Sequence, residues 1–118
     1  MGYLLGLDIG TSGVKALLIS VEGKIISSKT ASYPLATPHS GWAEQSPDDW
    51  WEATVKVIKE TVSNNSINSN QIIGISLSGQ MHSSVFLDEK MAVIRPAILW
   101  SDTRTSEQCQ EITLKLEG

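Results

Sequence analysis

The alternation of hydrophobic and polar residues first predicts three strands joined by short turns. Residues 3–9 are mostly apolar at both alternating positions, as expected of a strand buried on both faces. Residues 14–20 form a second apolar run after a glycine-rich turn. Residues 24–32 form a third and more polar strand after the turn at Glu22 and Gly23. Such short connections predict an antiparallel meander.

A helix is predicted after an irregular loop over residues 34–45. Ser46 fits the N-cap position, and Pro47 fits the first helical position, where its missing N–H costs nothing. Apolar residues then recur at the spacing of one helical face, and we expect this face to pack against the core. They are Trp51, Val55, Ile58 and Val62.

The rest of the chain predicts one more buried strand and one more helix. Residues 72–77 form a continuous apolar run, and residues 85–94 read as a hairpin around a polar turn. Residues 97–100 extend again, and a capping box at Thr105 starts a helix that is still under way near the end of the sequence. The predicted order is three strands, helix, strand, hairpin and helix, in one structural unit over residues 1–118.

Composition narrows the class of protein. The chain has 118 residues, 41% of them apolar, and a formal net charge of −4, which suits a folded domain and disfavours nucleic acid or an anionic membrane as partner. The single cysteine, Cys109, excludes an internal disulfide or a cluster of thiol metal ligands. We expect it to be an inert core residue of a cytoplasmic protein. The N-terminus does not resemble a signal peptide, and no apolar run is long enough to cross a bilayer.

The turn after the first strand carries the strongest signal for chemistry. Asp8 lies near the end of a buried strand, where a carboxylate is costly unless it has a partner or a function. The glycines of residues 10–13 permit a tight turn, and successive N–H groups there can form an anion-binding nest. We therefore predict a carboxylate directed at Mg²⁺ beside a phosphate cradle. A plain hairpin turn with Asp8 as a local cap is the alternative. The candidates are Asp8 as catalytic and metal-binding residue, with Gly10, Thr11, Ser12, Gly13 and Lys15 as cofactor-binding residues.

A second candidate group follows the strand over residues 72–77. Gln80 and His82 have side chains that can hydrogen-bond the hydroxyl groups of a polyol, and Met81 supplies an apolar wall. Ligands often bind beyond the carboxyl ends of strands. The alternative is an ordinary loop in which His82 is partly buried and hydrogen-bonded.

A third candidate group follows residues 97–100. Asp102 can accept hydrogen bonds from neighbouring hydroxyl groups, Arg104 can donate, and Trp100 can cover the face of a sugar. The alternative is an Asp102–Arg104 pair that holds the start of the following helix.

Four segments together resemble the N-terminal part of the FGGY family of carbohydrate kinases. The Asp8-x-Gly10-Thr11-Ser12-x-x-Lys15 segment resembles the family's first phosphate motif, which actin, hexokinase and Hsp70 ATPase domains share more loosely. The 41–51 segment (GWAEQSPDDWW) resembles its loop-to-helix passage. The 78–82 segment (SGQMH) and the 95–105 segment (RPAILWSDTRT) look most like the xylulokinases of that family. The resemblance covers essentially the whole chain.

The resemblance implies an α/β fold, namely the ribonuclease-H-like unit of the actin, hexokinase and Hsp70 ATPase superfamily. It implies transfer of the γ-phosphoryl group of ATP to a sugar, with D-xylulose giving D-xylulose 5-phosphate, and Mg²⁺ as the metal. Asp8 would help to place Mg²⁺, the 10–13 turn and Lys15 would meet the phosphates, and the second and third candidate groups would bind the sugar.

The resemblance also implies that much of the enzyme lies outside these residues. Family members are far longer, and their catalytic base is an aspartate in a later segment. We therefore expect this chain to be the incomplete first part of the N-terminal lobe, to be inactive alone, and to self-associate through exposed apolar surface. Three alternatives stay open: a gluconokinase or other FGGY sugar kinase, a non-catalytic nucleotide-binding module of the actin or Hsp70 type, and a ribonuclease-H-like nuclease. The acidic balance disfavours the nuclease.

Overall fold

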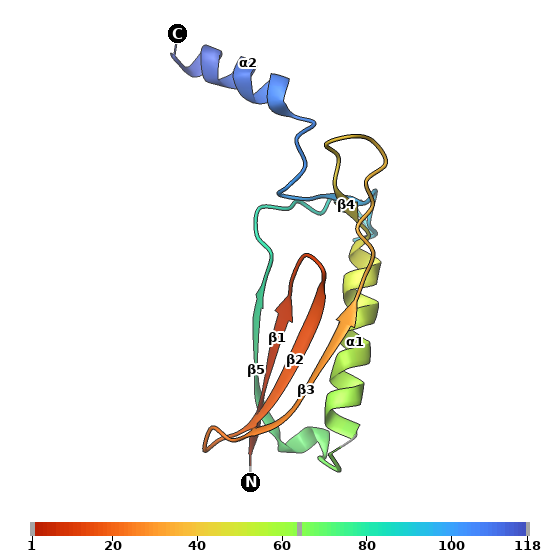
Figure 1. Ribbon diagram of the computed structural model, residues 1–118, viewed down its shortest axis with the longest axis vertical. Helices are drawn as coiled ribbons and strands as arrows, with labels where there is room; N and C mark the ends of the chain where they lie inside the picture. Colours follow the sequence, from red (N-terminus) through yellow and green to blue (C-terminus); the bar gives the residue numbers. More distant parts are fainter. Residues whose placement is uncertain (1, 64, 118) are drawn as a thin grey trace.

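The structure is a computed structural model that describes residues 2–63 and 65–117, and its centre is a four-stranded sheet crossed by one helix (Figure 1). The strands lie in the order β3-β2-β1-β5. They are β1 (Tyr3–Ile9), β2 (Gly13–Ser20), β3 (Ile25–Ser32) and β5 (Ile72–Gly79). The first three pair antiparallel, which confirms the predicted meander. β5 runs parallel to β1 after a crossover through helix α1 (Pro47–Ser63) and the short 3-10 helix η1 (Ser69–Gln71).

Helix α1 begins at Pro47 as predicted, but it turns a different face to the sheet. Its buried residues are Ala53, Thr54, Val57 and Thr61, which pack over β2 and β3. The predicted core face was therefore wrong, and Trp51 is 71% exposed. Of the predicted set, only Ile58 is packed against the core cluster. Small side chains line the buried stripe because they let the helix lie close to the strands.

A second, two-stranded sheet lies beyond one end of the first (Figure 1). It pairs β4 (Glu44–Gln45) with β6 (Ala97–Ile98) in antiparallel register. The prediction that residues 34–45 are all irregular was thus wrong at their last two positions. The predicted hairpin over residues 85–94 is present as an isolated bridge between Leu87 and Val93.

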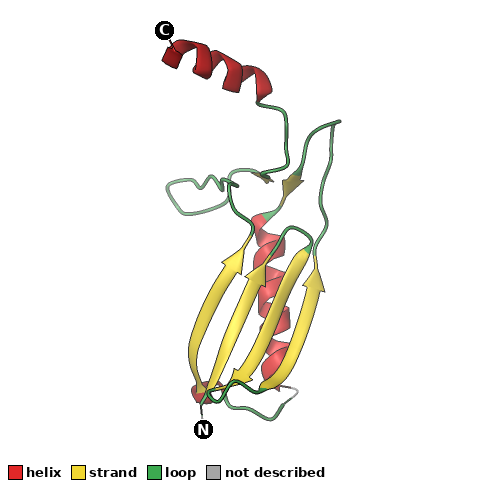
Figure 2. Cartoon of the chain, turned by 60° about the vertical axis from the view of Figure 1, so that its left-hand side comes forward, coloured by secondary structure: helices red, strands yellow, loops and turns green. Residues whose placement is uncertain are grey.

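Helix α2 (Ser106–Glu117) projects away from both sheets (Figure 2). It has no buried residue, so Cys109 is exposed and the expectation that it is a core residue was wrong. The reason is that nothing in the described part of the chain packs on the apolar side of this helix. Neither α2 nor any other helix among the described residues is both long enough and apolar enough to span a membrane.

Only one face of the large sheet is covered by α1 (Figure 2). The other face has a shallow apolar hollow lined by residues that include Leu4, Leu17 and Ile19. The outer strand β5 is also open, since Ile75 and Leu77 are 62% and 67% exposed. The expected exposed apolar surface is therefore present in the described residues, at the edge and on the second face of the sheet.

Thr61→Val is expected to raise the free energy of unfolding by about 1 kcal/mol, because a buried hydroxyl without a partner costs about that much. Thr61 is fully buried, and within residues 2–63 and 65–117 its hydroxyl has no hydrogen-bond partner. Urea denaturation checks this, with Thr54→Val as the matched control. The Thr54 hydroxyl donates to the Trp50 carbonyl at 2.7 Å, so its loss is expected to destabilise. Equal destabilisation by both variants would contradict the prediction.

Candidate functional site

The parallel pairing of β1 with β5 brings two of the three predicted groups to the same end of the sheet. Asp8 lies opposite Ser78, and Ile9 lies opposite Gly79. The 10–13 turn and the 80–82 segment therefore start side by side, and the small β4–β6 sheet lies beyond the same end (Figure 2). Their position beyond the carboxyl ends of two parallel strands is typical of ligand sites in α/β proteins.

Asp8 projects a carboxylate into an open hollow. The Ser78 hydroxyl donates to Asp8 Oδ1 at 3.1 Å, and Lys15 lies opposite Asp8 on β2. The hollow is lined by Asp8, the 10–13 turn, Lys15, Thr30 and Ser32. It thus presents one exposed carboxylate and one exposed ammonium group beside a backbone turn, a combination suited to a phosphate–metal pair.

The donor set around Asp8 fits Mg²⁺ only together with a ligand. Among residues 2–63 and 65–117, no three His, Cys, Asp or Glu side chains are close enough to hold a metal ion by themselves. Mg²⁺ is commonly bound by one or two carboxylates plus substrate phosphates and water, so a lone carboxylate is compatible with it.

The 10–13 turn is held from inside by Tyr33, which follows β3. The Tyr33 hydroxyl donates to the carbonyl oxygens of Gly10 and Gly13, to the latter at 3.2 Å. Gly13 is required by packing, since a Cβ there would lie 2.4 Å from the carbonyl oxygen of Ala31 on β3. Close strand pairing and a buried hydroxyl therefore fix the shape of the turn.

The hydroxyl of Tyr33 is expected to titrate above the ordinary tyrosine range. Burial raises its pKa, and the charge of Asp8 raises the pKa further. Only the neutral hydroxyl can donate to the carbonyl oxygens of the turn. The contribution of these hydrogen bonds to the stability of the fold is therefore fully present below pH 10.0 and is lost as pH rises through the raised pKa. Ultraviolet titration checks this, with Tyr33→Phe to identify the signal. A phenol that ionises below pH 10 and disappears in the variant would contradict it.

Gln80 is turned into the protein rather than toward the open hollow. Its Nε2 donates to Gln45 Oε1 at 3.0 Å and lies 3.5 Å from the Gly10 carbonyl oxygen. Its Oε1 accepts from the Thr11 hydroxyl at 3.4 Å. The structure thus assigns the amide of Gln80 to internal contacts with the 10–13 turn.

Met81 and His82 are on the surface of the same segment. Met81 is 71% exposed and His82 is also exposed. His82 has a φ of 65°, an uncommon conformation for a residue other than glycine, which Ser66 and Met91 also adopt. The predicted burial of His82 in the alternative interpretation is not observed.

Trp100 links the third group to the first. It is 57% exposed, and its indole Nε1 donates to the Thr11 hydroxyl at 3.2 Å. One part of this indole is therefore fixed against the 10–13 turn, and much of the ring is accessible to a ligand.

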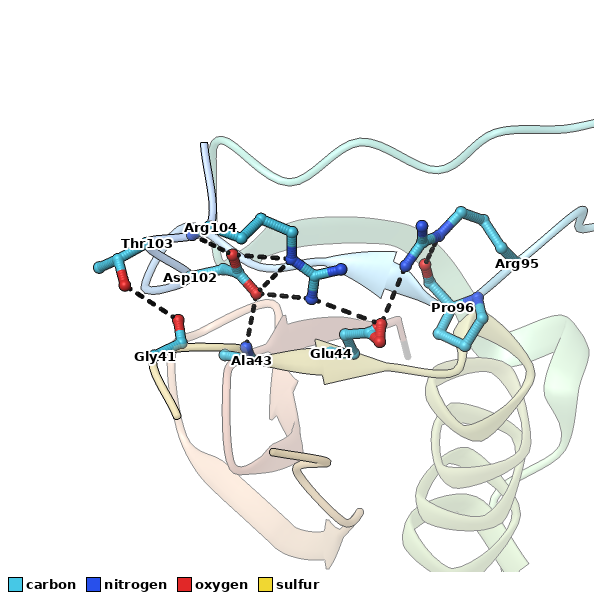
Figure 3. A network of polar contacts seen from close by, with 8 residues as sticks. All are labelled: Gly41, Ala43, Glu44, Arg95, Pro96, Asp102, Thr103 and Arg104. Atoms are coloured by element: carbon cyan, nitrogen blue, oxygen red, sulfur yellow. Dashed lines mark hydrogen bonds and ion pairs between the residues drawn. The ribbon is translucent and has the colours of Figure 1, made fainter. Parts of the chain in front are cut away.

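Asp102 and Arg104 form a tight ion pair (Figure 3). Arg104 Nη2 lies 2.7 Å from Asp102 Oδ2, and Nε donates to both carboxylate oxygens. The same carboxylate accepts from the backbone N–H of Ala43 at 2.7 Å and of Arg104 at 2.9 Å. The pairing proposed as the alternative to sugar binding is thus present, and the Asp102 side chain is only 1% exposed.

Glu44 extends this pair into a larger network. Its carboxylate lies 2.9 Å from Arg95 and 3.5 Å from Arg104, while the Arg104 guanidinium lies 3.7 Å from the centre of the Trp42 ring. We call Glu44, Arg95, Asp102 and Arg104 the corner network (Figure 3). It joins β4 to the segments on both sides of β6, and so it fixes the segment that carries Trp100.

The corner network determines the charge state of Asp102. The hydrogen bonds from the Arg104 side chain hold the pKa of that carboxyl far below its ordinary value of 3.8, and backbone N–H donors add to the effect. Asp102 therefore stays ionised through the whole neutral and mildly acidic range.

Sequence reasoning missed Tyr33, Glu44, Gln45 and Arg95 as parts of this region. Tyr33 followed a polar strand, and Glu44 and Gln45 lay in a segment expected to be an irregular loop. Apart from Trp50, which lies five positions from Gln45, their partners are 20 or more positions away in the sequence. No local periodicity reports contacts over such separations, although a run of polar residues directly before a helix N-cap was visible.

The chain matches the model for the N-terminal domain of the "FGGY family of carbohydrate kinases" over residues 3–118. It is 44% identical over 115 residues to the xylulose kinase of Bacillus subtilis and 47% identical over 116 residues to that of Lactococcus lactis. Each match covers 98% of this chain and 23% of the relative, so the chain spans about a quarter of the length of these proteins.

Solved structures agree with these matches. The "xyloylose kinase" of Brucella ovis superposes with a TM-score of 0.91 at 39% identity, covering 98% of this chain and 24% of that one. The gluconate kinase of Lactobacillus acidophilus superposes with a TM-score of 0.87 at 29% identity, covering 97% and 23%. The predicted fold class, the α/β unit of the actin, hexokinase and Hsp70 ATPase superfamily, is thereby confirmed.

Proposed function

The chain belongs to the FGGY family of carbohydrate kinases, and we propose that it forms the first part of the N-terminal lobe of a kinase that transfers the γ-phosphoryl group of ATP to a sugar. The observation that carries the proposal is the meeting of two groups at one end of the sheet. The exposed carboxylate of Asp8 and the 10–13 turn lie next to the segment with Met81 and His82. Donor phosphates and acceptor sugar would then be held side by side.

The proposed roles follow the chemistry of each group. Asp8 and the phosphate oxygens of ATP would hold Mg²⁺, which supplies charge neutralisation during transfer. The N–H groups of the 10–13 turn and the Lys15 ammonium would bind phosphate oxygens. Met81, His82 and the exposed part of Trp100 would contact the sugar. Gln80, Asp102 and Arg104 would shape the sugar site from behind, since their side chains are engaged in internal contacts.

D-Xylulose is the proposed substrate, with D-xylulose 5-phosphate as product. Xylulose kinases are the relatives at 44% and 47% identity, which supports this choice over other sugars. The gluconate kinase that superposes at a TM-score of 0.87 supports gluconate as the second candidate. A cytoplasmic setting, and self-association of the 118-residue chain through its open sheet face, are further parts of the proposal.

The decisive experiment is sugar-dependent ADP release by the protein translated from its full native reading frame. D-Xylulose, gluconate, glycerol and L-ribulose are compared at equal concentrations, and the 118-residue chain is assayed beside it. We expect strong stimulation by D-xylulose and no turnover by the short chain. Stimulation by another sugar would support the proposed kinase activity and contradict D-xylulose as the substrate. Nucleotide binding without stimulation by any sugar favours a non-catalytic module of the actin or Hsp70 type.

A further inference from the structure

The side chain of Gln45 is the buried junction between the two halves of the proposed site. Gln45 is 2% exposed, and each end of its amide has a partner. Nε2 donates to the Thr11 carbonyl oxygen at 2.6 Å. Oε1 accepts from the Trp50 indole at 2.9 Å and from Gln80 Nε2 at 3.0 Å.

These partners fix the orientation of the amide. A carbonyl oxygen can only accept a hydrogen bond, and an indole N–H can only donate one. The Gln45 nitrogen must therefore face Thr11, and its oxygen must face Trp50. The Gln45 oxygen can only accept a hydrogen bond, so it must be the nitrogen of the Gln80 amide that faces it. The oxygen of the Gln80 amide is then free to accept from the Thr11 hydroxyl.

One amide thereby joins three elements that are distant in sequence. Thr11 lies in the turn after β1, Gln80 follows β5, and Trp50 lies in the first turns of α1. We infer that Gln45 is a positioning residue, which holds the phosphate-binding turn in register with the segment that presents Met81 and His82. The inference rests on the proposed function, and it adds a buried residue that is to act through its neighbours and not by touching either substrate.

The physical reason is that transfer between two bound ligands depends on the distance between their sites. A shift of about 1 Å in one of two reacting groups can cost about a hundredfold in rate. Trp100 would move with the turn as well, because its indole is bonded to the Thr11 hydroxyl. Buried amides with all their partners hold such geometry better than exposed ones.

Gln45→Met tests this in the full-length protein, because it keeps the length of the side chain and removes both hydrogen-bonding ends. We expect kcat to fall about tenfold to a hundredfold, and KM for sugar and for ATP to change less than about threefold. Gln80→Met removes the same shared bond from the other side, together with the contacts of Gln80 with the Thr11 hydroxyl and the Gly10 carbonyl oxygen. If the two residues act through the shared bond, the loss of kcat in the double variant is expected to be clearly smaller than the product of the two single losses.

A second readout does not depend on turnover. The Gln80 N–H donates to the Ile9 carbonyl oxygen at 2.9 Å, so this amide reports on the register of the two segments, whereas the Gly10 N–H donates to the Gly13 carbonyl oxygen at 2.9 Å and reports on the closure of the turn. Hydrogen exchange at these amides is expected to be about tenfold faster in Gln45→Met and in Gln80→Met. The control is Thr61→Val, which changes a buried polar group of α1 and is expected to leave kcat within twofold and not to speed exchange at these amides.

The outcomes separate the two proposals. If the wild-type protein turns over no sugar, the proposed function is overturned. Hydrogen exchange in Gln45→Met then still decides whether Gln45 holds the 10–13 turn against the segment with Met81 and His82. Active wild type with unchanged kcat and unchanged exchange in Gln45→Met overturns the positioning role. If Gln45→Met does not fold, Gln80→Met decides alone, and unchanged Gly10 exchange in that variant overturns the role. Additive losses in the double variant also overturn it.

Discussion

Asp8→Asn is expected to lower sugar-dependent ADP formation by about a thousandfold, because it removes the negative charge proposed to hold Mg²⁺ beside the phosphates. The substitution preserves the size of the side chain. An asparagine carbonyl oxygen can still accept from the Ser78 hydroxyl, which donates to Asp8 Oδ1 at 3.1 Å. The carboxylate is exposed, so its neutralisation is expected to leave the fold unchanged. Steady-state rates at several Mg²⁺ concentrations check the prediction.

Asp48→Asn is the matched control for this variant. Asp48 is an exposed carboxylate in the first turn of α1, and its neutralisation makes the same change in net charge. Its expected effect on kcat is less than about twofold, since Asp48 does not line the hollow that contains Asp8 and the 10–13 turn. If Asp8→Asn keeps more than about a tenth of the wild-type rate, the metal-binding role of Asp8 is wrong.

The positions of the strands in the large sheet were predictable because their signal is local. The apolar runs that became β1, β2 and β5 are bounded by glycine or polar turns, and their pairing follows from short connections and one helical crossover. The buried face of α1 was not predictable in the same way. Trp51 dominated the periodic pattern because it is large, whereas the sheet accepts Ala53, Val57 and Thr61 because they are small. Hydrophobicity alone does not measure how closely two elements approach.

The candidate site likewise contains residues that the local sequence predicted and residues that it did not. Asp8 and the 10–13 turn were visible because residue type and spacing carry their chemistry. Gln45 was not visible, because its meaning depends on Thr11 and Gln80, which come from other elements. Cys109 shows the opposite error, since an apolar helical face predicted burial and no described element covers it. The local sequence pattern indicates whether a side chain favours burial, and the tertiary fold determines whether another element covers it.

Arg104→Met is expected to be the most damaging change in the corner network. The guanidinium gives Asp102 its main hydrogen bonds, also meets Glu44 at 3.5 Å, and stacks on Trp42. Met retains an unbranched apolar side chain against Trp42 but leaves the enclosed Asp102 carboxylate without its counter-charge. Removing one partner from an enclosed pair costs more than the pair itself contributes. We expect the melting temperature at neutral pH to fall by about 5 °C or more.

The pH dependence gives the sharper test, because its sign follows from the pKa of Asp102. Arg104 holds that pKa far below 3.8, so the stabilisation is fully present above this value and is lost as pH falls toward the lowered pKa. The melting temperature of the wild type should therefore fall on acidification. The melting temperature of Arg104→Met should be lower at neutral pH and should fall less over the same pH range. Arg95→Met is the control, since Arg95 is 42% exposed and contacts only Glu44 within the network. Parallel pH profiles of stability for Arg104→Met and wild type would show that the Asp102–Arg104 pair does not stabilise this corner. Equal losses of melting temperature in Arg104→Met and Arg95→Met would show that the stabilising carboxylate is Glu44 instead of Asp102.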